Sequence, residues 1–170
     1  MRIRQLAEHD LTRSHAIDVS ESGNVIYRYT DGALQTTVEQ WAHPRWTPEE
    51  WQRRLQHWMA DLHPDLFLGA FVDERLVGLA SLRYRLTETM AQLTTLHISR
   101  TYRRQGVATA LTQAVIRLVK AQGAQTLYVS ATESASAVNF YLSQGFRPTG
   151  EPHPTLFALE PNDIHMDMQL

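Results

Sequence analysis

A basic turn that contains a glycine is the first stretch of the sequence with the means to bind a ligand. Residues 93–98 form an alternating, β-branched run that is typical of a strand. Residues 103–108, RRQGVA, then begin a helical pattern. The first N–H groups of a helix lack partners within the helix, and the helix dipole adds positive charge there, so phosphates bind at this end. Gly106 would let a ligand approach the backbone, and Arg103 and Arg104 add charge. The turn therefore predicts a pyrophosphate site, with an ordinary solvated helix start as the alternative.

A second motif follows this turn at a distance that is typical of one protein family. RRQGVA resembles the Arg/Gln-x-x-Gly-x-Gly/Ala signature of the GNAT superfamily of acyl-CoA-dependent N-acetyltransferases. Residues 139–146, NFYLSQGF, resemble the Phe-Tyr-x-x-x-Gly-Phe stretch of the same family. The match is strong over about residues 70–150 and extends to the rest through the order of the elements. The chain further resembles a bacterial subgroup of the family whose members are often labelled only as acetyltransferases. This resemblance rests on residues 17–21, on the hairpin around residues 27–34 and on residues 156–166.

The resemblance implies that acetyl-CoA is the co-substrate. In the family, the turn amides cradle the CoA pyrophosphate, and the preceding strand parts from its neighbour to hold the pantetheine arm. In the family, the position seven residues before the tyrosine of the Phe-Tyr motif is often Asn. Here that tyrosine is Tyr141 and the position holds Ser134, whose hydroxyl can still bond the pantetheine. The implied CoA-binding residues are Leu96, His97, Ile98, Arg103, Arg104, Gln105, Gly106, Val107, Ala108, Thr109, Ser134 and Asn139.

Acetyl transfer from a thioester to an amine makes three chemical demands on the protein. The amine must be neutral, the developing oxyanion needs donors, and the leaving thiolate benefits from a proton. Because the chain has no cysteine, direct attack of the amine on bound acetyl-CoA is simpler than a covalent intermediate. The family's Phe-Tyr position makes Tyr141 the candidate general acid, since a phenol titrating near ~10 is closer to a thiol than a carboxylic acid is. The alternative for Tyr141 is a buried structural role.

The general base is less clear from the sequence. Some members of the family carry a Glu on the central strand where this chain has Gln92, which cannot take a proton. His97 titrates near neutrality, but its place in the alternation could turn it into the core as a structural histidine. Glu88 could act through a water relay.

Two carboxylates and an aromatic loop are the candidates for binding the acceptor. Asp18 and Glu21 would suit a cationic amine, although a solvated acidic helix end explains them equally well. Trp46 belongs to an aromatic loop over residues 41–46. The predicted acceptor-binding residues are Asp18, Glu21, Trp46 and Gln92.

Composition narrows the class of protein. With 170 residues and 43% hydrophobic content, the chain is long and apolar enough for one folded domain. A formal net charge of −2 does not mark a nucleic-acid-binding protein. The lack of cysteine excludes disulfides and cysteine metal sites, and we expect no metal. Neither a signal peptide nor a membrane span is evident, so we expect a cytoplasmic protein. A homodimer is compatible with the sequence.

The order of the predicted elements indicates an α+β fold. An opening strand and a weak helix over residues 8–20 precede a hairpin at 25–38, marked by Asp31-Gly32 and interpreted as an insertion near the acceptor side. A helix begins after Thr47, and strands at 66–72 and 75–84 lead to the central strand at 92–99. Late strands are predicted at 156–159 and 164–169. We therefore expect a single GNAT-like domain over 1–170, with a mixed sheet that is antiparallel first and has a parallel, splayed pair at the CoA site, flanked by helices.

Three functions are compatible with these residues. The first is acetylation of a primary amine of a small molecule, which the hairpin favours because an insertion could cap the site. The second is a protein acetyltransferase acting on an N-terminus or a lysine. The third is a non-catalytic CoA-binding regulatory module, against which the presence of Tyr141 weighs.

Overall fold

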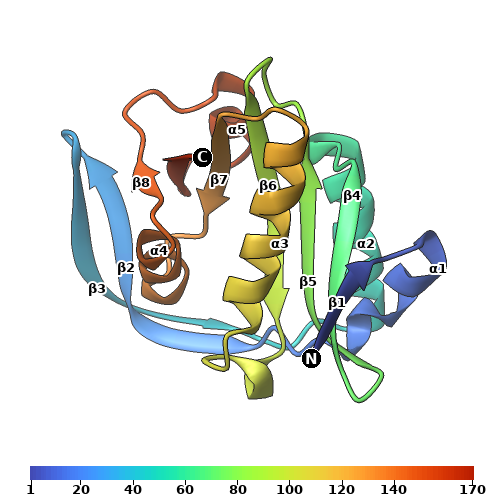
Figure 1. Cartoon of the computed structure of the whole chain (residues 1–170). Helices are drawn as coiled ribbons and strands as arrows, with labels where there is room; N and C mark the ends of the chain where they lie inside the picture. The colour runs from blue at the N-terminus through green and yellow to red at the C-terminus, as the bar shows by residue number, and fades with distance from the viewer.

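Strands outnumber helices along the chain (Figure 1). The computed structural model describes residues 1–170. The strands are β1 (Arg2–Gln5), β2 (Glu21–Thr30), β3 (Ala33–His43), β4 (Leu66–Val72), β5 (Arg75–Arg83), β6 (Met90–Ile98), β7 (Thr126–Ala131), β8 (Arg147–Pro148) and β9 (Ile164–Gln169). The helices are α1 (Glu8–Leu11), α2 (Pro48–His57), α3 (Val107–Ala121), α4 (Ala135–Ser143) and α5 (Pro154–Leu159), with short helical turns η1 (Thr12–Ala16), η2 (Trp58–Leu62) and η3 (Arg100–Tyr102). None of the helices is both long and apolar enough to cross a membrane.

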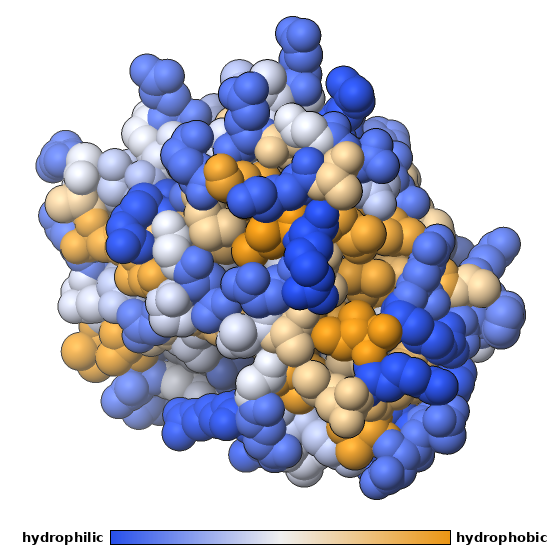
Figure 2. All heavy atoms as spheres, viewed as in Figure 1, coloured by the Kyte–Doolittle hydropathy of each residue, from blue (hydrophilic) through white to orange (hydrophobic).

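Seven strands form one mixed sheet in the order β1-β4-β5-β6-β7-β9-β8. Every neighbouring pair is antiparallel except β6 and β7. Helices α3 and α4 contribute to the main core cluster with side chains such as Leu111 and Val138, whereas α2 packs Trp51 and Leu55 into a second cluster. From the side of α3, patches of apolar side chains lie among hydrophilic ones on this face (Figure 2). The expected α+β class, with a mixed sheet flanked by helices, is confirmed.

The parallel contact between β6 and β7 is short. It holds only at Met90↔Thr126, Ala91↔Leu127 and Gln92↔Tyr128, after which the strands part. Near the parting point the register of β5 and β6 shifts, because Ser81 pairs with Thr95 while the next residue, Leu82, pairs with Leu93. The Ser81 hydroxyl lies 2.6 Å from the Thr94 hydroxyl and 2.7 Å from the Thr95 hydroxyl, so the extra residue is held in place. The splayed parallel pair predicted from the sequence is therefore present.

The hairpin is longer than predicted and forms a sheet of its own. Strands β2 and β3 run from residue 21 to residue 43 around the turn at Asp31 and Gly32, both of which have positive φ. The body of the hairpin lies along α4, where the Tyr27 N–H donates to the Glu133 carbonyl at 2.7 Å and Arg28 pairs with the Glu133 carboxylate. Only its base, at Glu21 and His43, reaches the groove described below.

Three predicted elements differ from the structure. Residues 156–159 were expected as a strand but belong to helix α5, because Pro154 is preorganised for the first helical turn and Leu156 anchors the helix in the core. The helix expected over 8–20 is reduced to α1 and η1. Residues 41–43, expected in a loop, extend β3 instead, and Trp41 fills the space above Gly23.

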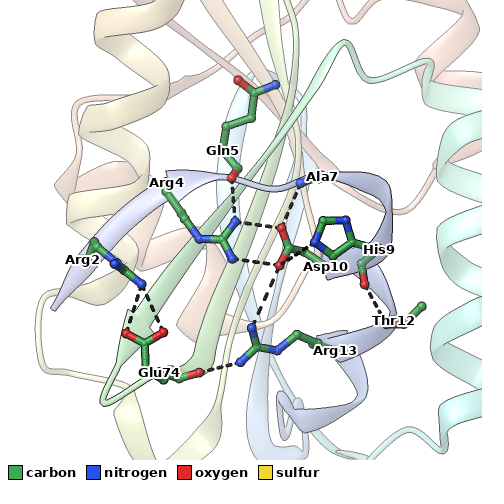
Figure 3. A network of polar contacts seen from close by, with 9 residues as sticks. All are labelled: Arg2, Arg4, Gln5, Ala7, His9, Asp10, Thr12, Arg13 and Glu74. Atoms are coloured by element: carbon green, nitrogen blue, oxygen red, sulfur yellow. Dashed lines mark hydrogen bonds and ion pairs between the residues drawn. The ribbon is translucent and has the colours of Figure 1, made fainter.

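An ion-pair network ties α1 to the sheet edge (Figure 3). Arg4 donates to both carboxylate oxygens of Asp10, at 2.7 and 2.8 Å, and the Ala7 N–H donates to the same carboxylate at 3.0 Å. The hydrogen bond from Arg4 is the largest cause that holds the pKa of Asp10 far below its ordinary value. Arg2 and Arg13 reach Glu74 in the turn between β4 and β5. This network lies apart from the opening between β6 and β7, and we assign it a structural role.

Candidate active site

The opening between β6 and β7 leads into a groove of about 1370 Å³. Its walls come from the second half of β6, the turn before α3, the start of α4, the segment between α5 and β9, and aromatic side chains beside α2. Because β7 leaves β6 after Gln92, alternate main-chain N–H and C=O groups of residues 93–98 face the groove without a strand partner. The groove thus offers a row of backbone donors and acceptors to an extended ligand.

The turn before α3 presents the free end of that helix to the groove. Gly106 is the N-cap of α3 with φ 80°, and no side chain caps the helix. A Cβ at Gly106 would meet no atom within 4 Å, so the space over the turn is open. Gly106, Val107, Ala108 and Thr109 all line the groove. Unpartnered N–H groups, the helix dipole and open space make this end suited to an anion.

The two arginines of the turn have different roles. Arg103 donates through Nε to the Ile98 carbonyl at 3.2 Å and through Nη2 to the Val19 carbonyl at 3.1 Å, and its Nη1 lies 3.4 Å from the Glu21 carboxylate. These contacts fasten the end of β6 to the chain before β2. Arg104 is exposed and has no ion-pair partner in the protein. Its charge is therefore the more available for a phosphate.

Ser134 and Asn139 place the start of α4 against the hairpin. Ser134 is the N-cap of α4, and its Oγ accepts from the Ala137 N–H at 3.4 Å. The Tyr27 hydroxyl donates to Oδ1 of Asn139 at 2.9 Å, and both Ser134 and Asn139 line the groove. Each of the two side chains therefore lines the groove and already has a hydrogen-bond partner in the protein.

Tyr141, in α4, lines the same groove. The residue is only 7% exposed, and its ring packs edge-on against Phe140 and Phe146. Burial, and then the charge of Asp163, raise the pKa of the Tyr141 phenol far above its ordinary value, with no hydrogen bond contributing. The phenol is therefore a neutral donor at physiological pH, with its hydroxyl unpartnered and facing the groove.

Two carboxylates in the groove had no role in the sequence analysis. Glu160 and Asp163 flank a Pro-Asn turn between α5 and β9, and both line the groove. Burial, and then the charge of Glu160, raise the pKa of Asp163 to about 7. Burial also raises the pKa of Glu160, against a hydrogen bond from Ser130. The available sequence signal was the spacing of two acids just before the last strand, but only the return of that strand to β7 brings them to the groove.

A buried polar network holds this acidic segment. The His153 N–H donates to the Tyr128 hydroxyl oxygen at 3.1 Å, and that hydroxyl lies 2.7 Å from Nδ1 of His165. Nε2 of His165 lies 3.0 Å from the Glu160 carbonyl, which can only accept, so Nε2 carries the hydrogen and Nδ1 accepts from Tyr128. Burial lowers the pKa of His165, which favours this neutral form. The network fixes the backbone from which the Glu160 side chain extends.

Four aromatic rings form a cage at the α2 side of the groove. His97 is stacked on Trp58 at 5.0 Å between ring centroids and meets Trp46 and Trp51 edge-on at 5.2 and 5.7 Å. The Arg54 guanidinium covers the Trp46 ring at 3.9 Å. Burial, and then the charges of Arg54 and Arg103, lower the pKa of His97 to about 4. His97 therefore has low proton affinity and is a weak base, in agreement with the structural alternative.

Several predicted site residues do not reach the groove. Asp18 accepts from the Ser20 N–H at 3.0 Å and shapes the chain before β2. Gln92 is 1% exposed at the parting point of β6 and β7, with Oε1 unpartnered. Gln105 donates to the Thr101 carbonyl at 2.8 Å on the outer side of the turn, and Glu88 is exposed elsewhere. Glu21 and Trp46 do line the groove, Glu21 as the partner of Arg103.

The fold and this groove are those of an acyl-CoA-dependent acetyltransferase. The family model described as "Acetyltransferase (GNAT) domain" matches residues 17–155, and the chain belongs to this family. It is thus an acetyltransferase that uses acetyl-CoA. Nowhere do three or more His, Asp or Glu side chains gather so as to hold a metal ion.

Solved structures share the fold over nearly the whole chain. Nourseothricin acetyltransferase is 19% identical, with a TM-score of 0.76, over 99% of this chain and 97% of that one. A Bacillus anthracis protein provisionally assigned as a streptothricin acetyltransferase, in complex with acetyl coenzyme A, is 17% identical with a TM-score of 0.73, over 99% and 98%. The ribosomal-protein-S18-alanine N-acetyltransferase of Escherichia coli is 17% identical with a TM-score of 0.60, over 99% and 92%. No curated protein matches the sequence.

The raised pKa of Asp163 predicts a pH-dependent effect on stability. The folded protein retains a proton on Asp163 up to a pH of about 7, whereas an unfolded Asp loses it near ~3.9. The contribution of Asp163 to the free energy of unfolding is therefore greatest below pH ~4 and is lost as the pH rises to about 7. Asp163→Asn keeps a neutral side chain, so its melting temperature should rise relative to wild type across this window and the difference should level off above it.

Thermal melts over a pH series test this expectation. Asp61→Asn is the control, because Asp61 is an exposed carboxylate outside the groove. Its difference from wild type should stay flat across the same window. A flat difference for Asp163→Asn as well would contradict the raised pKa.

Proposed function

We propose that the enzyme acetylates a primary amine of a small molecule by direct attack on bound acetyl-CoA. The observation that carries the proposal is one groove with two unlike ends. The α3 turn and the free edge of β6 suit a phosphate-bearing, extended ligand, whereas the acidic segment suits a cationic amine. Holding both substrates in one groove replaces a bimolecular step with an intramolecular one.

Acetyl-CoA would lie from the α3 turn toward the parting point of β6 and β7. In this proposal its pyrophosphate meets the N–H groups of residues 106–109 and the charge of Arg104. Its pantetheine arm follows Leu96, His97 and Ile98 as an added strand would, with Ser134 and Asn139 on the opposite wall. Support comes from two fold neighbours that hold the cofactor, the Bacillus anthracis protein with acetyl coenzyme A and a Thermoplasma acidophilum N-acetyltransferase with coenzyme A.

Tyr141 would protonate the CoA thiolate as it leaves. Its hydroxyl is neutral, unpartnered and directed into the groove, so it can donate without first breaking a bond within the protein. Expulsion of the thiolate in a water-poor groove would otherwise leave an unsolvated anion. The attacking amine, the carbonyl carbon and the departing sulfur would then all lie in one cavity.

The walls of the acceptor end favour a small amine. Glu160 and Asp163 line the groove without a cation to pair with, so they suit a cationic amine, and the aromatic side chains Trp46 and Trp58 line another part of the same groove. The fold neighbours named for acetylation of nourseothricin and streptothricin bring these compounds into the test. A neighbour named for a ribosomal protein means that fold alone does not exclude a peptide, so peptides belong in the test.

An acceptor panel tests the proposal. The enzyme is given acetyl-CoA with nourseothricin, diamines, amino acids and peptides that carry a free N-terminus or a lysine, and thiol release is recorded. We expect turnover with small cationic amines and little with peptides. Turnover confined to peptides would favour the protein acetyltransferase, and CoA binding without any turnover would favour the non-catalytic module.

Gly106→Glu should abolish CoA binding with the fold retained, because it places a bulky negative side chain at the helix end. Gly123→Glu is a matched control. Gly123 also has positive φ, at 82° against 80° for Gly106, and in both places a Cβ would meet no atom within 4 Å. Each variant should lose a similar ~1–2 kcal/mol of stability from left-handed backbone strain. Calorimetry with CoA should separate them, and equal CoA affinity in the two variants would place the pyrophosphate elsewhere.

Tyr141→Phe should lower kcat while acetyl-CoA binds nearly as before, because the ring packing stays and only the proton donor is lost. General acid catalysis typically contributes ~10²–10⁴-fold, or about 3–5 kcal/mol of barrier. Steady-state kinetics with an amine from the panel measure the effect, and a melt checks the fold. A kcat within a factor of about two of wild type would leave Tyr141 as a packing residue.

A further inference from the structure

We propose that Asp163 accepts the proton of the acceptor amine and that Glu160 beside it attracts the positive charge of that acceptor. This inference rests on the proposed acetylation of a small amine and adds the base that the sequence did not identify. It stands on the geometry of the groove, on the ion pairing of the other carboxylate that lines it, and on the unpartnered hydroxyl of Tyr141.

The two carboxylates are built into the wall of the groove. Both side chains line the groove, and the Asp163 N–H donates to the Glu160 carbonyl at 3.2 Å, which closes the turn that presents them together. The Tyr128–His165 network binds the same carbonyl from behind. The segment is therefore fixed at both ends, by α5 and by the pairing of Ile164 with Ala131 in β7.

The other carboxylate of the groove is already committed. Glu21 is paired with Arg103, which itself fastens β6 to the chain before β2. Neither Glu160 nor Asp163 has an ion-pair partner. A buried or half-buried carboxylate without a cation is costly, and a cationic ligand would relieve that cost. The pair thus presents unpaired negative charge to the groove.

The remaining titratable groups do not compete for the role of base. Tyr141 faces Asp163 from α4, and Glu160 faces it from its own segment, while His165 and Tyr128 lie behind on β9 and β7 and bond to one another. His97 on the far wall is a weak base because its pKa is about 4. His43 also lines the groove, but it lies at the base of the hairpin, paired in register with Glu21 and with its ring beside Trp41, away from the segment that carries Asp163. The other charged residues that line the groove are cations from α2 and the turn before α3, namely Arg54, Arg100, Arg103 and Arg104.

Tyr141 supplies an independent sign that a ligand belongs beside Asp163. Its side chain is 7% exposed, its hydroxyl has no partner in the protein, and it lines the groove that Asp163 lines. The two residues are near enough for the Asp163 charge to raise the pKa of the phenol. Because this hydroxyl has no partner within the protein, it is free to bond a ligand in the groove.

The two groups close a balanced proton cycle. The amine nitrogen forms a bond to the thioester carbon, the C–S bond breaks, and the sulfur leaves with its electron pair. Asp163 takes a proton from the nitrogen, and Tyr141 gives a proton to the sulfur, which leaves a neutral carboxyl and a phenolate. Because the phenolate has much the higher proton affinity, a proton then passes from Asp163 to Tyr141 directly or through water, and both groups return to their starting states.

The test is the pH dependence of kcat/KM with nourseothricin and with 1,4-diaminobutane as acceptors. Wild type should lose activity as the pH falls below about 7, where Asp163 becomes protonated. Asp163→Asn should lower kcat by ~10²–10⁴-fold near neutrality. As the pH rises, the activity of Asp163→Asn should increase by about tenfold per pH unit, because the neutral amine then forms in solution without a base from the protein. Acetyl-CoA affinity, measured by calorimetry, should stay within a factor of about two.

Glu160→Gln should act differently. It should raise the KM for the acceptor and move the acid limb to lower pH, because the charge of Glu160 contributes to the raised pKa of Asp163. The matched controls are Asp61→Asn and Glu39→Gln, exposed carboxylates outside the groove, which should reproduce wild type.

The outcomes separate this inference from the proposed function. Acetylation of no amine by wild type would contradict both. Acetylation by wild type with an unchanged acid limb in Asp163→Asn, and a kcat within a factor of about three, would overturn the role of Asp163 alone. A fall in acetyl-CoA affinity that parallels the fall in kcat would also overturn it, because it would assign Asp163 to the cofactor end of the groove.

Discussion

The early parting of β6 and β7 is the constraint on which the rest of the structure depends. A parallel pair normally satisfies the main-chain groups of both strands, but here the pairing stops after Gln92 and Tyr128. The groups of residues 93–98 that face the gap are left without a strand partner, and unpaired main-chain groups are costly when buried. The bulge held by Ser81 and the separate turns at the starts of α3 and α4 keep the gap open. The fold thus maintains an unfilled strand position that an extended ligand can complete.

Many of the charged residues around this gap stabilise the walls. Arg103 joins β6 to the chain before β2, and Arg28 joins the hairpin to Glu133, which precedes the N-cap of α4. Asp163 is the contrast, because burial disfavours its charged form and no cation in the protein compensates. A carboxylate kept in that state reduces stability near neutral pH, and such a cost is common where activity requires a perturbed group.

The fold neighbours show how little of the acceptor is determined by the fold. Proteins named for nourseothricin and for a ribosomal protein alanine share this architecture at under 20% identity. Acceptor choice must therefore depend on side chains at the groove walls. In this chain the groove walls include the aromatic cage around His97 and the acidic segment before β9, and our proposals assign the acceptor to the acidic segment.

The sequence by itself determined most of the local elements and the turn before α3, where we propose that the cofactor binds. Gly106 with its basic flank, the helix after it and the Asp31-Gly32 hairpin turn depend on neighbouring residues, so their spacing was enough to predict them. Even locally, residues 156–159 were misassigned, because an apolar run of that length suits a strand or a helix equally well. Only the tertiary structure decided which charges were free. Arg103 and Glu21 pair with each other from distant segments, and Glu160 and Asp163 reach the groove that Tyr141 lines only because β9 returns to pair with β7. Burial and pairing set the chemistry of a carboxylate, and both depend on residues far away in the chain.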